Sequence, residues 1–175
     1  MKKILITVLI IGFGTTVYSQ DINKEYLKRT ETIDVTIKSL YEVISGAKGE
    51  ERDWDFLRFL FHPEAKLIAS GKKKDGGYGA RYVTVEDYIT NSGKWMLENG
   101  FYEQELHRVT EQFGHIAHVF SSYQSFYSKE DQEPFMRGIN SIQLMYTGKR
   151  WTVVSIYFTQ ESSENPIPNK YLPSE

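Results

Sequence analysis

The chain has 175 residues, with 21 basic and 23 acidic side chains, no cysteine and 14 % aromatic residues. This length suits one domain with a full hydrophobic core, and the aromatic share argues against a disordered chain. A formal net charge of −2 gives no indication of nucleic-acid binding, which needs a clustered positive field. The absence of cysteine excludes disulfides, thiolate metal sites and a thiol nucleophile.

The N-terminal segment has the pattern of a secretory signal peptide. Lys2 and Lys3 precede an apolar run over residues 4–14, and Ser19 offers a small residue at a cleavage point. The apolar run is shorter than the ~20 residues of a membrane anchor, which is the alternative interpretation. We expect residues 1–19 to be removed, leaving an exported protein, periplasmic or extracellular, with no membrane attachment. Its net charge would be −4.

Hydrophobic periodicity predicts three helices in the first hundred residues. Residues 34–45 carry apolar side chains at every third or fourth position. Residues 53–61 are apolar on several sides, and this helix should end before Pro63. A third helix is expected from the capping residue Thr84 to Gly100.

The pattern changes to strict alternation from residue 101 onward, which is typical of strands. Residues 71–79, rich in glycine and lysine, are expected to form a solvated loop rather than an anion-binding cradle. Helices followed by long antiparallel strands predict an α+β domain over residues 20–160, with an extended, proline-containing tail over 161–175. The predicted strands cover residues 65–70, 82–83, 101–112, 115–127, 138–146 and 151–158.

The last predicted strand is apolar on both faces if it alternates regularly. Trp151 and Val153 would lie on one side, and Val154, Ile156 and Phe158 on the other. A second apolar face needs a covering surface, so we expect a homodimer formed through the outer face of the sheet.

Seven strings of residues carry a resemblance to a known superfamily. They are 52–54, 60–65, 114–123, 137–144, 150–153, 166–168 and 171–172. In these strings the chain resembles nuclear transport factor 2-like proteins, and more narrowly secreted bacterial members with no assigned activity. The resemblance implies a cystatin-like half-barrel: a cone-shaped, curved, antiparallel or mixed sheet with three N-terminal helices on its concave face, a cavity and often a dimer. The superfamily includes isomerases, lyases, polyketide cyclases, hydrolases and non-catalytic binding modules, so no single activity follows.

A cavity with a few convergent polar groups is the usual form of a small-molecule site. Pairing the last hairpin across residues 148–149 would place Asn140 opposite Tyr157 and Ile142 opposite Ser155. These polar groups would then face the cavity, unless they only bond to one another in the core. The candidate ligand-binding residues are Trp54, Ser121, Tyr123, Asn140, Trp151, Ser155 and Tyr157.

Catalytic candidates are fewer and carry no recognised motif. Glu103, Glu105 and His107 alternate along one strand, so they could transfer protons or bind a metal, although a solvated outer face gives the same pattern. His62 would lie near the mouth of the cone. The catalytic candidates are therefore His62, His107 and Glu105. The register of the 101–127 hairpin decides which of them face inward, and the sequence leaves it open. No metal or cofactor is indicated.

We therefore expect an exported protein that binds a small, partly apolar molecule. One alternative is a small lyase, isomerase or hydrolase that uses a cavity histidine with tyrosine or glutamate. The other is a dimeric protein-interaction module.

Overall fold

The computed structural model describes residues 19–173, so the expected signal peptide lies almost entirely outside the described residues. No helix within this range has the length and hydrophobicity needed to cross a membrane. The helices are α1 (Ser19–Lys28), α2 (Ile33–Ile44), α3 (Trp54–Leu60), α4 (Val85–Asn99) and the short 3₁₀ helix η1 (Asn169–Tyr171). The strands are β1 (Phe61–Lys72), β2 (Tyr78–Val83), β3 (Tyr102–Phe113), β4 (Ile116–Phe126), β5 (Met136–Tyr146) and β6 (Trp151–Gln160).

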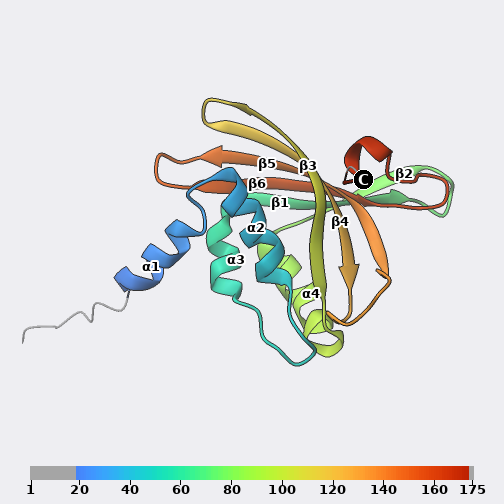
Figure 1. Cartoon of the computed structure of the whole chain (residues 1–175), viewed down its shortest axis with the longest axis horizontal. Coiled ribbons are helices and arrows are strands. Elements are labelled where there is room, and N and C mark those ends of the chain that lie inside the picture. The colour runs from blue at the N-terminus through green and yellow to red at the C-terminus, as the bar shows by residue number, and fades with distance from the viewer. Residues whose placement is uncertain (1–18, 174–175) are drawn as a thin grey trace, which may run out of the picture.

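The six strands form one curved sheet in the order β2-β1-β6-β5-β4-β3. Only the contact between β1 and β6 is parallel; the other neighbours are antiparallel. Helices α2, α3 and α4 lie on one side of this sheet (Figure 1). The expected α+β architecture, with a mixed sheet and helices on one face, is confirmed.

The helix ends follow the capping residues of the sequence. Thr84 and Asp87 form a reciprocal capping box at the start of α4, and Gly100 ends this helix with a positive φ of 79°. Asp53 caps α3 by accepting a hydrogen bond of 2.8 Å from the backbone N–H of Phe56. These caps fix where α3 and α4 begin, and therefore which of their side chains face the sheet.

A β-bulge in β6 changes which side chains face the helices. Leu144 pairs with Val153 but Gln143 pairs with Ser155, so Val154 is an extra residue in the ladder. The expected regular alternation was therefore wrong. The inward-facing residues, Trp151, Val153, Ile156 and Phe158, now lie on one face and pack with the hydrophobic core. The second apolar face inferred for this strand does not exist in that form.

A second bulge interrupts β3 at Leu106. Glu105 pairs with Tyr123, whereas His107 pairs with Ser122. Tyr123 faces the helices and Ser122 faces the opposite side of the sheet, so Glu105 points inward and His107 points outward. The prediction that these two side chains share a face was wrong, because the bulge reverses the alternation between them.

The C-terminal segment covers part of the outer sheet face. The hydroxyl of Ser122 donates to the backbone oxygen of Tyr171 over 2.5 Å, and the Tyr171 ring lies 4.9 Å from that of Phe120. Ile167 is buried in the same segment. Part of the surface expected for a homodimer is thus occupied by the chain itself, and the homodimer remains a prediction.

Candidate binding cavity

A cavity of about 410 Å³ lies between α2, α3, α4 and the inward face of the sheet. This volume is within the range of small-molecule sites. The lining is mostly apolar and aromatic, and its one acidic side chain is Glu103. The lining residues are Leu40, Tyr41, Ile44, Leu57, Phe61, Leu67, Tyr88, Asn91, Ser92, Trp95, Met96, Phe101, Glu103, Tyr123, Met136, Asn140, Ile156, Phe158 and Gln160.

The mouth of the cavity lies between α4 and the sheet. Of the lining residues, Asn91, Trp95 and Gln160 are exposed, and Ser92 and Met136 are half-buried. The ring of Trp95 also packs edge-on against Phe101, with 6.2 Å between the ring centres. A ligand would therefore enter past the α4 side chains and meet aromatic rings first.

Glu103 supplies the acidic group of the cavity. Its Oε2 accepts a hydrogen bond of 3.2 Å from the Ser125 hydroxyl, and its Oε1 accepts one of 3.3 Å from the Asn140 amide. Burial raises the pKa of Glu103 to about 7, although both hydrogen bonds oppose that rise. The carboxyl group therefore changes its charge near neutral pH, as a ligand-responsive or proton-transferring group does.

A chain of hydrogen bonds holds Asn140 in place behind Glu103. The Asn140 amide also donates a hydrogen bond of 3.2 Å to the Tyr41 hydroxyl. The Tyr41 hydroxyl in turn lies 2.8 Å from the Ser121 hydroxyl. Ser121 donates its single hydrogen to Oε1 of Glu105 over 2.6 Å. Tyr41 must therefore donate to Ser121, because a serine hydroxyl has only one hydrogen to give. The amide nitrogen of Asn140 is fully used by Tyr41 and Glu103.

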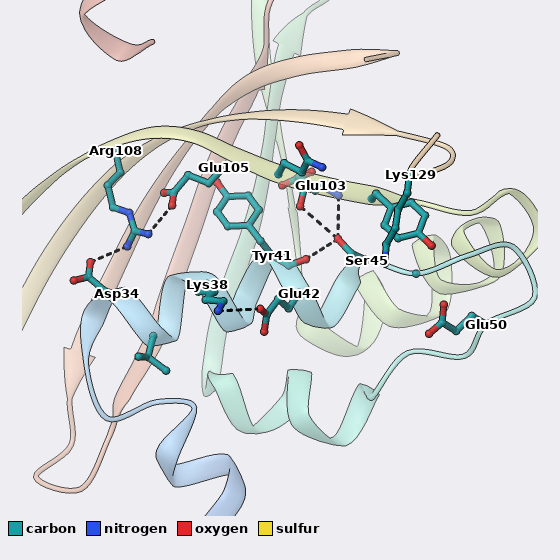
Figure 2. Close-up of a pocket in the computed structure, with 14 residues that line it drawn as sticks. Asp34, Lys38, Tyr41, Glu42, Ser45, Glu50, Glu103, Glu105, Arg108 and Lys129 are labelled. Atoms are coloured by element: carbon teal, nitrogen blue, oxygen red, sulfur yellow. Dashed lines mark hydrogen bonds and ion pairs between the residues drawn. The ribbon is translucent and has the colours of Figure 1, made fainter. Parts of the chain in front are cut away.

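The chain of hydrogen bonds ends in ion pairs that face a separate, polar groove. Glu105 lies 2.6 Å from Arg108, which also contacts Asp34 at 3.0 Å (Figure 2). The groove has a volume of about 770 Å³, and Tyr41 and Glu103 line both it and the cavity. These two side chains therefore form the wall between a charged groove and an apolar cavity.

Two tyrosine hydroxyls in the cavity have no hydrogen-bond partner within residues 19–173. They belong to Tyr88 of α4 and Tyr123 of β4, and both side chains line the cavity. Burial, and next the charge of Glu103, raises the pKa of each hydroxyl. Both stay neutral at physiological pH and can donate or accept a hydrogen bond to a bound molecule.

The structure brings together only some of the predicted ligand-binding residues. Tyr123 and Asn140 line the cavity. Ser121 lies behind them and holds Tyr41. Trp151 packs against Tyr146 at 5.5 Å in the core. Trp54 packs against Gly93 of α4, since a Cβ at that glycine would lie 3.0 Å from its ring.

Ser155 and Tyr157 do not face the cavity. The bulge at Val154 turns them to the outer side of the sheet, where they pair with Gln143 and Ser141. Tyr157 is 48 % exposed. Their predicted place inside the cavity was wrong, and Ile156 and Phe158 occupy it instead.

The catalytic candidates also lie elsewhere. The Nδ1 atom of His62 accepts a hydrogen bond of 3.1 Å from the backbone of Glu64, and His107 faces outward. Glu105 is engaged by Arg108 and Ser121. None of the four histidines lines the cavity, and residues 19–173 contain no cluster of three metal-binding side chains.

Several lining residues were missed at the sequence level. Tyr88, Ser92, Trp95 and Met96 repeat at helical spacing in α4, so this face of the helix was the available signal. Glu103 was considered only together with Glu105 and His107, and the bulge separates the last of these from the other two.

Comparisons with known proteins identify the fold. No family model and no curated protein sequence matches the chain. A nuclear transport factor 2-like protein with a cystatin-like fold from Novosphingobium aromaticivorans has a TM-score of 0.58 at 12 % identity, covering 87 % of this chain and 96 % of that one. A protein of unknown function with a cystatin-like fold from Nostoc punctiforme has a TM-score of 0.53 at 12 % identity, covering 74 % and 92 %.

A further similar structure has a stated role. It is the beta subunit of a putative aromatic-ring-hydroxylating dioxygenase from Novosphingobium aromaticivorans, with a TM-score of 0.54 at 14 % identity, covering 77 % of this chain and 90 % of that one. At this level of identity the similarity shows the fold alone. The chain thus has the cystatin-like fold of nuclear transport factor 2-like proteins, as its sequence resemblance implied.

Proposed function

We propose that the protein binds a small, largely apolar molecule in the cavity between α4 and the sheet. The observation that carries this proposal is the convergence of Glu103, Asn140 and two unpartnered tyrosine hydroxyls in an otherwise apolar cavity. Apolar walls supply affinity through burial, and the polar groups orient one polar end of the ligand.

A role in core packing alone does not explain why the polar groups of Glu103, Tyr88 and Tyr123 lie in an apolar cavity. Burying a polar group without a partner costs about 1–3 kcal/mol, and a carboxyl that can ionise costs more. A leucine at position 103 and phenylalanines at 88 and 123 would avoid that cost. The Tyr88 and Tyr123 hydroxyls have no partner in the described chain, and Glu103 can accept more than its two hydrogen bonds, so a bound molecule can supply further partners to all three.

The N-terminal pattern supports export as part of the same proposal. A binding protein outside the cytoplasm would meet its ligand before the ligand enters the cell. The direct test is N-terminal sequencing of the protein from the cell exterior or periplasm. A mature chain that begins at Gln20 would support export, and an intact Met1 in all fractions would contradict it.

A second candidate function is proton transfer by Glu103. A carboxyl whose pKa is about 7 is a suitable general base, and the Tyr88 and Tyr123 hydroxyls could stabilise developing negative charge. Loss of deuterium from methyl-deuterated acetophenone, followed by NMR, tests this. Wild type should accelerate the exchange and Glu103→Gln should abolish the acceleration; equal rates with and without protein would reject it. The histidine-based alternative has no support in the cavity.

The binding proposal is tested with an uncharged fluorescent dye, N-phenyl-1-naphthylamine. Wild type should show a saturable rise in dye fluorescence. Ser92→Trp places an indole at the cavity mouth and should weaken binding at least about tenfold by excluding the dye from the apolar walls. Thr90→Trp, on an exposed part of the same helix, should bind as wild type.

Circular dichroism melting of both variants confirms that they fold. Failure of wild type to bind the dye, or dye binding to Ser92→Trp as tight as to wild type, would contradict the proposal.

A further inference from the structure

Glu103 has no cationic partner within residues 19–173. Its two hydrogen bonds come from the neutral side chains of Ser125 and Asn140. Arg108, on the same strand, is occupied by Glu105 and Asp34 on the groove side of the wall. The cavity lining contains no lysine, arginine or histidine. A carboxylate buried without a counter-charge is costly, and a cation entering the cavity would remove that cost.

Arg52, the buried arginine near the C-terminal end of α2, cannot serve as that partner. Its guanidinium is held by backbone carbonyls at the ends of α2 and α4. It donates to the oxygens of Ile44 at 3.3 Å, Gly46 at 2.6 Å, Ala47 at 3.1 Å and Met96 at 3.5 Å, and also to Glu50. Its donors are therefore spent on the chain itself.

The polar groups of the cavity offer acceptors in excess of donors. The Asn140 nitrogen is used by Tyr41 and Glu103, which leaves its Oδ1 without a donor in the described part of the chain. Both Glu103 oxygens are acceptors when the group is ionised, and the hydroxyls of Tyr88 and Tyr123 can accept as well. An ammonium group has three donors and no acceptor, so it matches this arrangement.

The walls around this polar end are aromatic. A cation over the face of such rings is attracted by their π electrons, and the effect is stronger where water is excluded. The same rings offer a flat apolar surface for a ligand ring. The aromatic lining residues are Tyr41, Phe61, Tyr88, Trp95, Phe101, Tyr123 and Phe158.

We propose that the ligand is a primary arylalkylamine, bound as its ammonium ion against Glu103 and Asn140 with its ring between the aromatic walls. This inference rests on the proposed binding function and names the chemical class of its ligand. An anionic ligand would instead meet the charge of Glu103 with no cation to offset it. A neutral ligand would leave the carboxylate without its counter-charge.

Proton release on binding follows from the same geometry. Free Glu103, with its pKa of about 7, is partly protonated at pH 7, and an ammonium ion favours the ionised form. Binding at pH 7 should thus release a fraction of a proton. On the cavity side, the titratable groups facing Glu103 are Tyr41, Tyr88 and Tyr123, whose raised pKa values keep them neutral in this range. On the groove side, the charged groups that share its lining are Asp34, Lys38, Glu42, Glu50, Glu105, Arg108 and Lys129. Of the cations among them, Lys38 pairs with Glu42, Arg108 pairs with Asp34 and Glu105, and Lys129 lies over the Tyr102 ring.

The experiment compares three probes of similar shape by calorimetry: 2-phenylethylamine, 2-phenylethanol and phenylacetate. At pH 8.5 the amine should bind at least about tenfold more tightly than the alcohol, and phenylacetate most weakly. At pH 5.5 amine affinity should fall by up to about thirtyfold, because Glu103 is then mostly protonated before binding. The affinity for the alcohol should change little.

Two glutamate variants test whether the preference for the amine depends on the carboxylate in the cavity or on the net charge of the protein. Glu103→Gln should remove the preference for the amine and keep alcohol binding. Glu98→Gln, which removes the same charge from the exposed side of α4, should keep the preference. Equal affinities for amine and alcohol, tighter binding of phenylacetate, or an amine preference that survives in Glu103→Gln would overturn the inference.

Displacement of N-phenyl-1-naphthylamine keeps the two proposals distinguishable. If wild type binds the dye but 2-phenylethylamine does not displace it, the cavity binds apolar molecules and the amine inference is wrong. If wild type does not bind the dye at all, the proposed function itself fails.

Discussion

The amide nitrogen of Asn140 lies 3.3 Å from Oε1 of Glu103 and donates a hydrogen bond to it. The same nitrogen is held by Tyr41. The orientation of the cavity carboxyl therefore depends on a chain of side chains that continues to the ion pairs of the neighbouring groove. Binding in the cavity and the packing of α2 on the sheet are physically linked through this contact.

The stability of the protein should depend on pH through Glu103. Its pKa is about 7 in the folded protein, against 4.5 for an ordinary glutamate. The stability that this raised pKa confers is therefore fully present below pH 4.5 and is lost as the pH rises through 7. The effect amounts to up to about 3 kcal/mol. Urea unfolding of wild type and Glu103→Gln at pH 4.5 and pH 8 measures it.

Glu103→Gln removes this contribution, so the variant should gain stability relative to wild type as the pH is raised. The difference between the two proteins isolates Glu103 from all other titrating groups. A difference that stays constant from pH 4.5 to pH 8 would show that the carboxyl is not held in the environment described.

Arg52→Met should destabilise the fold by about 3 kcal/mol, because the change removes five hydrogen bonds and leaves the backbone oxygens of Ile44 and Glu50 without a donor among the residues that the structure describes. Arg58→Met is the matched control. Arg58 is exposed, and its ion pairs with Asp55 and Glu86 should contribute less than about 1 kcal/mol. Equal losses in chemical denaturation would contradict the role assigned to Arg52.

Gly138→Ala should distort the cavity. A Cβ at this position would collide with the carbonyl oxygen of Thr159 and lie 2.6 Å from the Tyr123 hydroxyl. Displacement of β5 or of the tyrosine ring should cost about 1–3 kcal/mol and weaken dye binding. Gly71→Ala, where no atom lies within 4 Å of the added carbon, should change neither. Wild-type dye affinity in Gly138→Ala would place Tyr123 outside the binding site.

The C-terminal segment should stabilise the sheet from its outer side. Tyr171→Ser removes the ring that packs on Phe120 and should cost about 1–2 kcal/mol. Tyr78→Ser, at a tyrosine that is 77 % exposed, should be close to neutral. Sedimentation velocity of both variants also reports whether uncovering Phe120 promotes self-association. Equal stabilities of the two variants would mean that the tail is not docked.

The sequence was sufficient to predict the fold class and most of the elements; α1 and the 3₁₀ helix η1 were not predicted. Thr84, Asp53 and Gly100 act at helix ends through local hydrogen bonds and a positive φ, so their roles are visible in short strings. Alternation predicted both long hairpins. The order of strands, with β1 beside β6, depends on packing between distant segments and came only with the structure.

The candidate site was predicted only in part because two bulges, at Leu106 and Val154, are not encoded in alternation. Each inserts one residue, and each reverses the direction in which the later side chains of its strand face. Tyr123 lies on β4 and Asn140 on β5, whereas the extra residues lie in β3 and β6, so these two side chains were placed correctly on the inward face. Tyr157 lies beyond the extra residue of β6 and was not.

Carbon NMR of the Glu103 carboxyl observes the binding site itself. Its resonance is assigned from its absence in Glu103→Gln, and N-phenyl-1-naphthylamine is then titrated into wild type. The resonance should titrate near pH 7 in the free protein and shift saturably as the dye binds, while that of the exposed Glu98 stays unchanged. A Glu103 resonance that does not respond while the dye binds would place the ligand elsewhere and contradict the proposed cavity.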